Sequence, residues 1–211
     1  IALAEQEGLI VTLGDRVLRL ACEQGRKWLD QGLEFQRIAV NVSVKQFIEN
    51  DYVSKVQNTL EQTGLPPSKL ELELTESVFL GDRDLAKDTM EKLTGQGVCF
   101  AIDDFGTGFS SLLYLKELPV SKLKLDQGFI RGITKDHSSL QIVKASLQMG
   151  HALSMEVIAE GVETDEEQSL LTELHCQQAQ GYLFSRPLKS ELITADKIAQ
   201  IKRNVCLVTE A

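Results

Sequence analysis

The stretch CFAIDDFGTGFSSL, Cys99–Leu112, ends an apolar run on two adjacent aspartates, Asp103 and Asp104. A Gly-Thr-Gly turn follows them after Phe105. Two like charges at the edge of a dry core repel each other, and holding them there costs several kcal/mol unless a cation neutralises them. The sequence therefore predicts a counter-ion at this pair.

Five other short apolar segments also carry polar side chains at or near their C-terminal ends. These side chains are Asn41, Glu73, Glu76, Lys124, Asp126, Glu160, Glu163 and Gln180. Carboxylates and a carboxamide are the ligand set of hard divalent cations such as Mg²⁺ or Mn²⁺, which prefer oxygen. A metal at Asp103, with a second at Asp104, would supply the counter-charge. Two such ions close together suit phosphodiester hydrolysis, because they clamp the attacking and leaving oxygens.

Short apolar or alternating segments take turns with longer amphipathic ones along almost the whole chain. The short segments have the length and period of strands, and they are Phe35–Ser43, Lys69–Ser77, Val98–Asp104, Ser121–Asp126, Met155–Val162 and Ala179–Phe184. The segments between them have apolar residues at helical spacing, and one opens on a capping box formed by Thr164 and Glu167. Such an alternation predicts an α/β fold with a parallel sheet, either an open doubly wound layer or a closed (β/α)8 barrel.

The predicted strands number six, and the chain opens with a helix, Gly14–Gln31. A closed barrel needs eight strands. The shortfall predicts either an open sheet or a barrel whose first two strands lie upstream of Ile1 or are missing. In a parallel barrel the C-terminal ends of the strands converge on one face, where such folds carry their active sites. The polar strand ends would then meet around one cavity.

The composition limits the classes of function. The chain has 211 residues, 43% of them hydrophobic, which fits one globular domain with a sizeable core. A net charge of −9 argues against binding to polymeric nucleic acid or to anionic membranes, since both need clustered Lys and Arg. The four cysteines are scattered, and neither a signal peptide nor a membrane span is recognisable. We therefore expect free thiols and a cytoplasmic domain without membrane contact of its own, any tether to the inner membrane belonging to other parts of a parent protein.

Simpler interpretations of the same residues stay open on spacing alone. Adjacent aspartates after a strand more often form an exposed turn or a helix cap, and only the convergence of six strand ends favours a metal site. Lys124 can be read as a surface residue, and Lys122 shares its face of the strand by period two. Asp126 and Glu163 are more typical of loop residues beside a site than of ligands. The triplet Asp104-Phe105-Gly106 also occurs in protein kinases, but no H-R-D loop or glycine-rich ATP loop accompanies it.

The motifs AIDDFGTGFSSLLYL, NVS, ELTES, KLKLD, AEGVE and QGYLFSRPL occur in an order and at intervals that resemble the EAL domain family. The resemblance runs from about Ile1 to Leu188, and the D-D-F-G-T-G-x-S-S block with the K-x-K-x-D after it is highly specific. Members of this family are bacterial phosphodiesterases that linearise the second messenger cyclic di-GMP to pGpG. The resemblance implies a (β/α)8 barrel of the TIM type with an atypical antiparallel first strand. It also implies one EAL-type domain over residues 1–211, truncated at its N-terminus.

The resemblance implies a role for each metal ligand as well. Asn41, Glu73 and Asp103 would bind one metal ion, and Asp104 would bind the other. Glu160 would serve both ions and so take part in catalysis. The cofactors implied are two ions of Mg²⁺ or Mn²⁺.

Further roles concern residues around the metals. Lys124 would sit beside the attacking water as a base or an electrostatic partner, and Gln180 would hold water in the metal shell. Glu76 would brace the loop DFGTGFSS, residues 104–111. In this family that loop links the active site to a dimer interface, so the resemblance implies a homodimer.

The sequence departs from the family at one motif. The Glu-Ala-Leu that names the family supplies a metal ligand at the end of the second barrel strand, and it does not occur in this chain. The first residues, IALAEQEGLI, look like the helix that follows that strand, so we expect the missing piece upstream of Ile1. Two functions stay open: a metal-dependent cyclic di-GMP phosphodiesterase, or an inactive module that binds cyclic di-GMP or a partner protein. A sensory or GGDEF domain is expected elsewhere in the parent protein.

Overall fold

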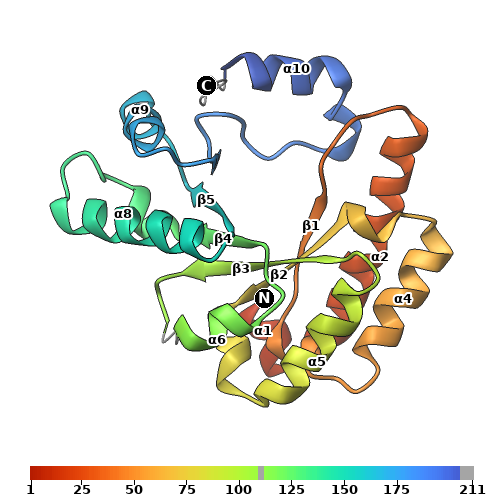
Figure 1. Cartoon of the computed structure of the whole chain (residues 1–211). Helices are drawn as coiled ribbons and strands as arrows, with labels where there is room; N and C mark the ends of the chain where they lie inside the picture. Colours follow the sequence, from red (N-terminus) through yellow and green to blue (C-terminus); the bar gives the residue numbers. More distant parts are fainter. Residues whose placement is uncertain (109–111, 205–211) are drawn as a thin grey trace. The chain divides into compact units, whose positions relative to one another are not determined.

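The computed structural model describes residues 1–108 and 112–204, in which strands and helices alternate (Figure 1). The strands are β1 Ile38–Asn41, β2 Leu70–Thr75, β3 Cys99–Phe105, β4 Lys122–Leu125, β5 Glu156–Glu160 and β6 Gln178–Gln180. The α-helices are α1 Ala2–Gln6, α2 Ile10–Asp30, α3 Val44–Phe47, α4 Tyr52–Thr63, α5 Arg83–Thr94, α6 Leu112–Glu117, α7 Gln127–Ile130, α8 His137–Ala152, α9 Asp165–Glu173 and α10 Ala195–Asn204. Short 3₁₀ turns are η1 Pro67–Lys69, η2 Glu76–Leu80 and η3 Ser190–Leu192.

Each of the six segments predicted as strands overlaps one strand, and the six follow one another in the sheet in chain order. The pairs β1–β2, β4–β5 and β5–β6 are parallel. Consecutive parallel strands joined through helices are the arrangement of βα units. The predicted α/β class with a parallel sheet is therefore confirmed.

Two compact units make up the chain, and the boundary between them falls inside β3, after Ile102. The first unit holds α1 to α5, β1 and β2. Its core includes the ring of Phe47, whose centroid lies 5.5 Å from that of Tyr52 and 6.2 Å from that of Phe100. Helices α2 and α4 lie side by side in this unit (Figure 1). Strand β2 is buried along nearly its whole length, glutamates included. A strand buried on both faces is typical of parallel sheets covered by helices.

The second unit begins at Asp103 and holds β4, β5 and β6. Helix α8 runs along β4 and β5 (Figure 1), and Gly150 permits this packing, because a Cβ there would lie 2.3 Å from Val157 Cγ2. Helix α9 opens on the predicted capping box of Thr164 and Glu167, in which both reciprocal hydrogen bonds are present. These local signals fix where the helices of this unit begin and how closely they approach the strands.

Two predicted boundaries are each wrong by four residues. Helix α2 begins at Ile10 rather than Gly14, because its apolar face continues to that buried residue and Gly14 sits within the helix. The last strand, predicted over Ala179–Phe184, ends at Gln180 and gives way to a turn. The cause is Gly181, whose backbone lies against that of Val162, so closely that a Cβ would come 2.1 Å from the Val162 carbonyl oxygen.

Two further properties concern the helices and the cysteines of the described residues. None of these helices is both long and apolar enough to cross a membrane. Cys22, Cys99 and Cys176 are free thiols, as predicted, while Cys206 lies outside the described residues. Burial raises the pKa of the Cys22 thiol to about 11, with a smaller contribution from the charge of Glu23. A thiol with so high a pKa stays protonated at neutral pH and is a poor nucleophile or metal ligand.

Candidate metal centre

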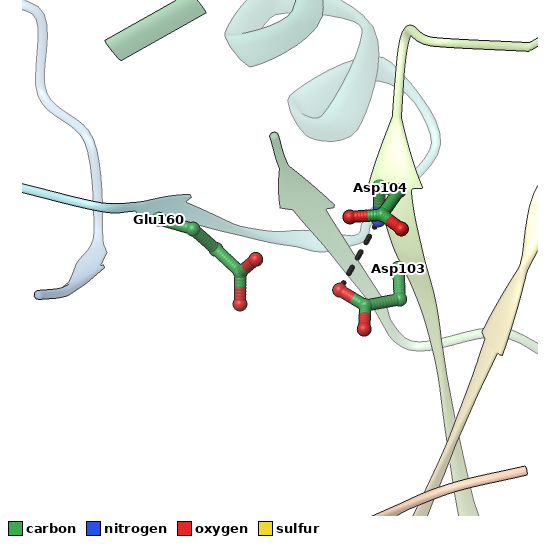
Figure 2. A group of neighbouring side chains, drawn as sticks. All are labelled: Asp103, Asp104 and Glu160. Atoms are coloured by element: carbon green, nitrogen blue, oxygen red, sulfur yellow. Dashed lines mark hydrogen bonds between the residues drawn. The ribbon is translucent and has the colours of Figure 1, made fainter. Parts of the chain in front are cut away.

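Three carboxylates of the second unit gather at strand ends. Asp103 and Asp104 end β3, Glu160 ends β5, and one oxygen from each lies within 4.8 Å of the other two. Figure 2 shows the carboxylate of Glu160 facing those of the two aspartates. Residues 57 positions apart thus meet because the carboxyl ends of strands in a parallel sheet share one edge. The predicted convergence of these three side chains is observed.

The backbone of Asp104 explains how two adjacent strand residues join one cluster. Successive side chains of a strand normally point to opposite faces. Asp104 has φ +53°, in the left-handed region, which breaks the alternation at the strand end. Its N–H donates to Asp103 Oδ1 at 3.1 Å (Figure 2), and the Thr107 hydroxyl donates to its carbonyl oxygen at 2.8 Å.

Lys124 of β4 supplies a cation to this cluster. Its Nζ lies 2.9 Å from Asp103 Oδ1 and 2.9 Å from Glu160 Oε1, and its side chain is only 5% exposed. Buried charges are stable only when they are paired, and here one ammonium pairs with two carboxylates. The counter-ion that the adjacent aspartates predict is therefore provided in part by the chain itself.

Asp104 is a carboxylate of the cluster whose negative charge its surroundings disfavour. Burial raises the pKa of its carboxyl group, the negative charges of Asp103 and Asp126 raise it further, and the ammonium of Lys124 partly offsets them. A carboxylate that is disfavoured by neighbouring negative charge gains from an added cation. The electrostatics thus favour binding of a positive ligand at Asp104.

A pocket of about 250 Å³ opens beside the cluster in the second unit. Its walls combine acidic, amide, glycine, guanidinium and aromatic groups. The lining residues are Asp104, Asp126, Gln127, Arg131, Glu160, Gly161, Glu163, Gln180, Gly181 and Tyr182. Five residues predicted from the sequence to lie near the site, among them Gln180, therefore line one pocket.

The predicted loop residues have structural partners. Asp126 caps α7 by accepting a hydrogen bond from the Gly128 N–H at 2.8 Å. Glu163 pairs with Arg131, Oε1 to Nη2, at 2.8 Å, with both side chains substantially exposed. Asp126 and Glu163 line the pocket, and their contacts with Gly128 and Arg131 hold the loops that carry them.

A buried carboxylate ties these loops together. Glu167, 5% exposed, accepts hydrogen bonds from the backbone N–H groups of Gly132 at 3.0 Å, Glu163 at 3.0 Å and Thr164 at 3.2 Å. Burial alone raises the pKa of Glu167, but the N–H groups of Glu163, Gly132 and Thr164 outweigh it and lower the pKa below its ordinary value. We name this set the Glu167 clamp. It joins the loop after α7 to the loop after β5, and both carry pocket residues.

The other predicted ligands belong to the first unit. Asn41 and Glu73 are register partners at the ends of β1 and β2, and the Val42 N–H donates to the Glu73 carbonyl oxygen at 2.9 Å. Glu73 is buried and Asn41 is exposed. Glu76 is buried at the start of η2. These residues sit at adjacent strand ends, as predicted, and their part in metal binding stays a prediction.

Sequence reasoning missed five of the pocket residues, which are Gln127, Arg131, Gly161, Gly181 and Tyr182. Gln127 and Arg131 lie at the two ends of α7, and the other three lie in segments predicted as strands but beyond the ends of β5 and β6, so their positions depend on how a turn is packed. One local signal was available: Gly161 has φ +72°, and a Cβ there would lie 2.4 Å from the Gln127 Cβ. A glycine directly after the predicted ligand Glu160 is the residue that such a turn requires.

The residues of the cluster fit a hard divalent cation. Their donor atoms are carboxylate oxygens, which Mg²⁺ and Mn²⁺ prefer. A cation close to Asp104 would lower the raised pKa of its carboxyl group, because a nearby positive charge stabilises the carboxylate. The three histidines of the chain are not among the clustered groups.

Comparison with known proteins shows which family and which relatives the chain matches. Residues 1–187 match the EAL domain family. The chain is 47% identical over 193 residues to MucR of Pseudomonas aeruginosa, a bifunctional diguanylate cyclase/cyclic di-GMP phosphodiesterase, and the match covers 92% of this chain and 28% of MucR. The chain thus spans less than a third of the length of that relative.

Solved structures agree. The MucR phosphodiesterase in complex with cyclic di-GMP superposes with a TM-score of 0.87 at 47% identity, over 90% of this chain and 77% of that one. Klebsiella pneumoniae BlrP1, solved with manganese and cyclic di-GMP, gives a TM-score of 0.77 at 28% identity, over 85% and 45% of the two chains. The predicted fold, an incomplete (β/α) barrel of the TIM type, is confirmed by these likenesses. With the motifs, the strand order and the family match in agreement, the chain belongs to the EAL domain family.

Proposed function

We propose that this chain is a metal-dependent phosphodiesterase that hydrolyses cyclic di-GMP to linear pGpG. The observation that carries the proposal is the cluster of three carboxylate oxygens within 4.8 Å, at strand ends beside the buried Lys124. Membership of the EAL domain family and the likeness to a cyclic di-GMP phosphodiesterase support the substrate. The reaction breaks one phosphodiester bond of the ring by adding water across it.

Two ions of Mg²⁺ or Mn²⁺ are proposed as cofactors. Asn41, Glu73 and Asp103 would hold one ion, Asp104 the other, and Glu160 both. When bound, such ions neutralise the phosphate and make a bound water acidic enough to attack it. Acidic residues alone would repel a phosphodiester, so the proposal also accounts for how an acidic pocket accepts an anionic substrate.

Lys124 is the proposed catalytic residue beside the attacking water. Its ammonium is held by Asp103 and Glu160 at 2.9 Å each, which fixes its position at the edge of the cluster. A preorganised cation stabilises negative charge that develops on the phosphate oxygens without further rearrangement. Gln180 lines the same pocket, where its carboxamide is proposed to hold water by hydrogen bonds.

A homodimer through the DFGTGFSS loop region is proposed as the assembly. Glu76 is the proposed brace of that loop, whose residues 109–111 lie outside the described residues. The sedimentation coefficient, with and without substitutions in this loop, tests the assembly. An attached sensory or GGDEF domain and a cytoplasmic location are proposed for the parent protein, in keeping with the longer relative.

A second candidate is an inactive module that binds cyclic di-GMP or a partner protein. One observation favours it: Lys124 already pairs with Asp103 and Glu160, so the cluster is partly neutralised without a metal ion. The two candidates differ in the product, because only the enzyme releases pGpG.

The decisive experiment follows pGpG release by chromatography with Mg²⁺ or Mn²⁺ and measures metal binding by calorimetry. Asp103→Asn removes a charge from the cluster, and we expect it to abolish hydrolysis and weaken metal binding. Asp88→Asn is the matched control, because Asp88 is 54% exposed in α5 and pairs with its helix neighbour Lys92. Binding of cyclic di-GMP without turnover would favour the inactive module, and full turnover in Asp103→Asn would refute the site.

A further inference from the structure

Helix α2 carries a glycine in its interior, Gly14, where alanine would be the more favourable residue. The space beside this glycine is taken by Gln46 of α3. A Cβ at position 14 would lie 2.1 Å from Gln46 Oε1, 2.6 Å from its Cδ and 2.7 Å from its Nε2, so the whole carboxamide occupies the place of a side chain. The glycine thus leaves a notch in α2 that the carboxamide of Gln46 fills.

The carboxamide is buried and hydrogen-bonded in this notch. Gln46 is 2% exposed, and its Nε2 donates to Asp15 Oδ1 at 3.3 Å. Asp15 Oδ2 in turn lies 3.5 Å from Nζ of Lys55 in α4, which restrains the acceptor. We name Gly14, Asp15 and Gln46 the Gln46 anchor. It fastens α3 to α2 by a contact of matched shape and by a hydrogen bond.

Helix α3 needs tertiary contacts because it is a single turn. It has four residues, Val44–Phe47, and an isolated helix of that length is not stable in water. Ser43 caps its start by accepting a hydrogen bond from the Gln46 N–H at 3.2 Å, and Phe47 at its end is buried. The orientation of the turn therefore depends on what its side chains contact, and the Gln46 anchor supplies a directional contact.

The turn closely follows the proposed metal ligand Asn41. Strand β1 ends at Asn41, and only Val42 and Ser43 separate it from α3. On the strand side, Asn41 is the register partner of Glu73, and the Val42 N–H donates to the Glu73 carbonyl oxygen at 2.9 Å. The Asn41 side chain itself is exposed, so burial does not hold it in place. Its position depends on the backbone before and after it.

We propose that Gln46, seated in the notch at Gly14, is a positioning residue that holds Asn41 where the proposed metal ion needs its oxygen. The inference rests on the proposed function and adds to it a residue that acts through the backbone rather than on the metal. A buried glutamine that only fills the core would affect the stability of the fold and leave metal binding unchanged. Replacing a group that orients a metal ligand typically weakens metal binding by roughly 10- to 100-fold.

A double-mutant cycle tests the anchor, with Mn²⁺ affinity measured by calorimetry and with kcat and KM measured at saturating Mn²⁺. We expect Gly14→Ala to weaken Mn²⁺ binding by roughly tenfold, because the added methyl group expels the carboxamide, while kcat and KM change little. Gln46→Ala should weaken Mn²⁺ binding by a similar factor. Gly14→Ala should have no further effect in the Gln46→Ala background, since the methyl group then meets no carboxamide.

Two more variants sharpen the cycle. Thr12→Ala is the matched control, because Thr12 is exposed in the same helix. Asn41→Ala supplies a second background, in which Gly14→Ala should leave the Mn²⁺ affinity unchanged because the positioned ligand is gone. Additive effects in either cycle would overturn the inference, and so would a Gly14→Ala variant that binds Mn²⁺ as tightly as the unmodified protein.

Amide hydrogen exchange of the metal-free protein gives a readout that needs no activity. Loss of a buried hydrogen bond changes a local opening equilibrium by roughly tenfold, so we expect the amides of residues 42–47 to exchange about tenfold faster in Gly14→Ala and in Gln46→Ala. Unchanged exchange there would contradict the anchor whatever the metal does. If the unmodified protein binds no Mn²⁺ and releases no pGpG, the proposed function fails and the exchange still decides the anchor; if it does both and the variants match it, only the anchor fails.

Discussion

Replacing Glu167 by Ala removes the carboxylate of the Glu167 clamp and leaves three backbone N–H groups without their acceptor. A hydrogen bond to a charged group contributes about 1.5–3 kcal/mol, and an unsatisfied buried donor costs about 1–3 kcal/mol. The three bonds share one charge, and water enters a vacated site, so their effects do not add. We therefore expect Glu167→Ala to lower the free energy of unfolding by about 3 kcal/mol.

The same variant has a defined pH dependence. The pKa of Glu167 is lowered in the folded protein, because its backbone partners outweigh the effect of burial. A carboxyl group of this kind stabilises the fold above its unfolded pKa, about 4.3 for glutamate, and the stabilisation is lost as the pH falls through the lower folded value. The difference between the unmodified protein and Glu167→Ala should be constant near neutral pH and should shrink below about pH 4.

Urea unfolding monitored by circular dichroism, from pH 7 down to pH 3, measures both effects. A loss of about 3 kcal/mol corresponds to a fall in Tm of roughly 6–12 °C for a chain of this size. Glu166→Ala is the control, because Glu166 is an exposed acid in the same first turn of α9. Glu167→Gln keeps one acceptor oxygen but turns an NH₂ donor toward an N–H donor, so we expect it to recover less than half of the loss. A difference that stays constant down to pH 3 would refute the electrostatic reasoning.

Three further outcomes are expected. Lys124→Ala should lower kcat by roughly 10²-fold, as loss of an acid–base or electrostatic group does, with little change in KM or in the far-ultraviolet spectrum; a raised KM alone would make Lys124 a binding residue. Gly181→Ala should cost about 1–3 kcal/mol of stability in urea, because its Cβ would meet the Val162 carbonyl oxygen at 2.1 Å, and an unchanged midpoint would show that the turn can move. Chelation of metal should stop pGpG release without unfolding the chain, because Lys124 already pairs with Asp103 and Glu160, and melting on chelation would contradict that assignment.

The approximate positions of the strands and the start of α9 could be predicted because they depend on local patterns. The period-two alternation of a strand and the capping box of Thr164 and Glu167 each involve only a few consecutive residues. The convergence of Asp103, Asp104 and Glu160 could also be predicted, because parallel strands bring their carboxyl ends to one edge whatever the detailed packing. These predictions needed no knowledge of loop conformation.

The remaining features depend on packing between distant segments. Lys122 and Lys124 share a face by period, both are buried, and no local pattern says that Lys124 makes the two ion pairs with Asp103 and Glu160. The end of β6 was misplaced because the fit of Gly181 against the Val162 backbone is invisible in sequence. Pocket residues carried by turns follow such contacts, so a pattern of hydrophobicity cannot find them.

The left-handed backbone at Asp104 has a consequence for natural and laboratory selection. A residue with a Cβ in this region is strained by about 1 kcal/mol, and the nearby charges of Asp103 and Asp126 add to the cost. Glycine would adopt φ +53° without that cost and would remove the repulsion, yet it carries no carboxylate. Selecting variants of this chain for heat resistance alone would thus enrich replacements at Asp104, and those variants would lack one carboxylate of the proposed metal site. An aspartate at such a position thus lowers the stability of the fold in exchange for a carboxylate at the proposed site.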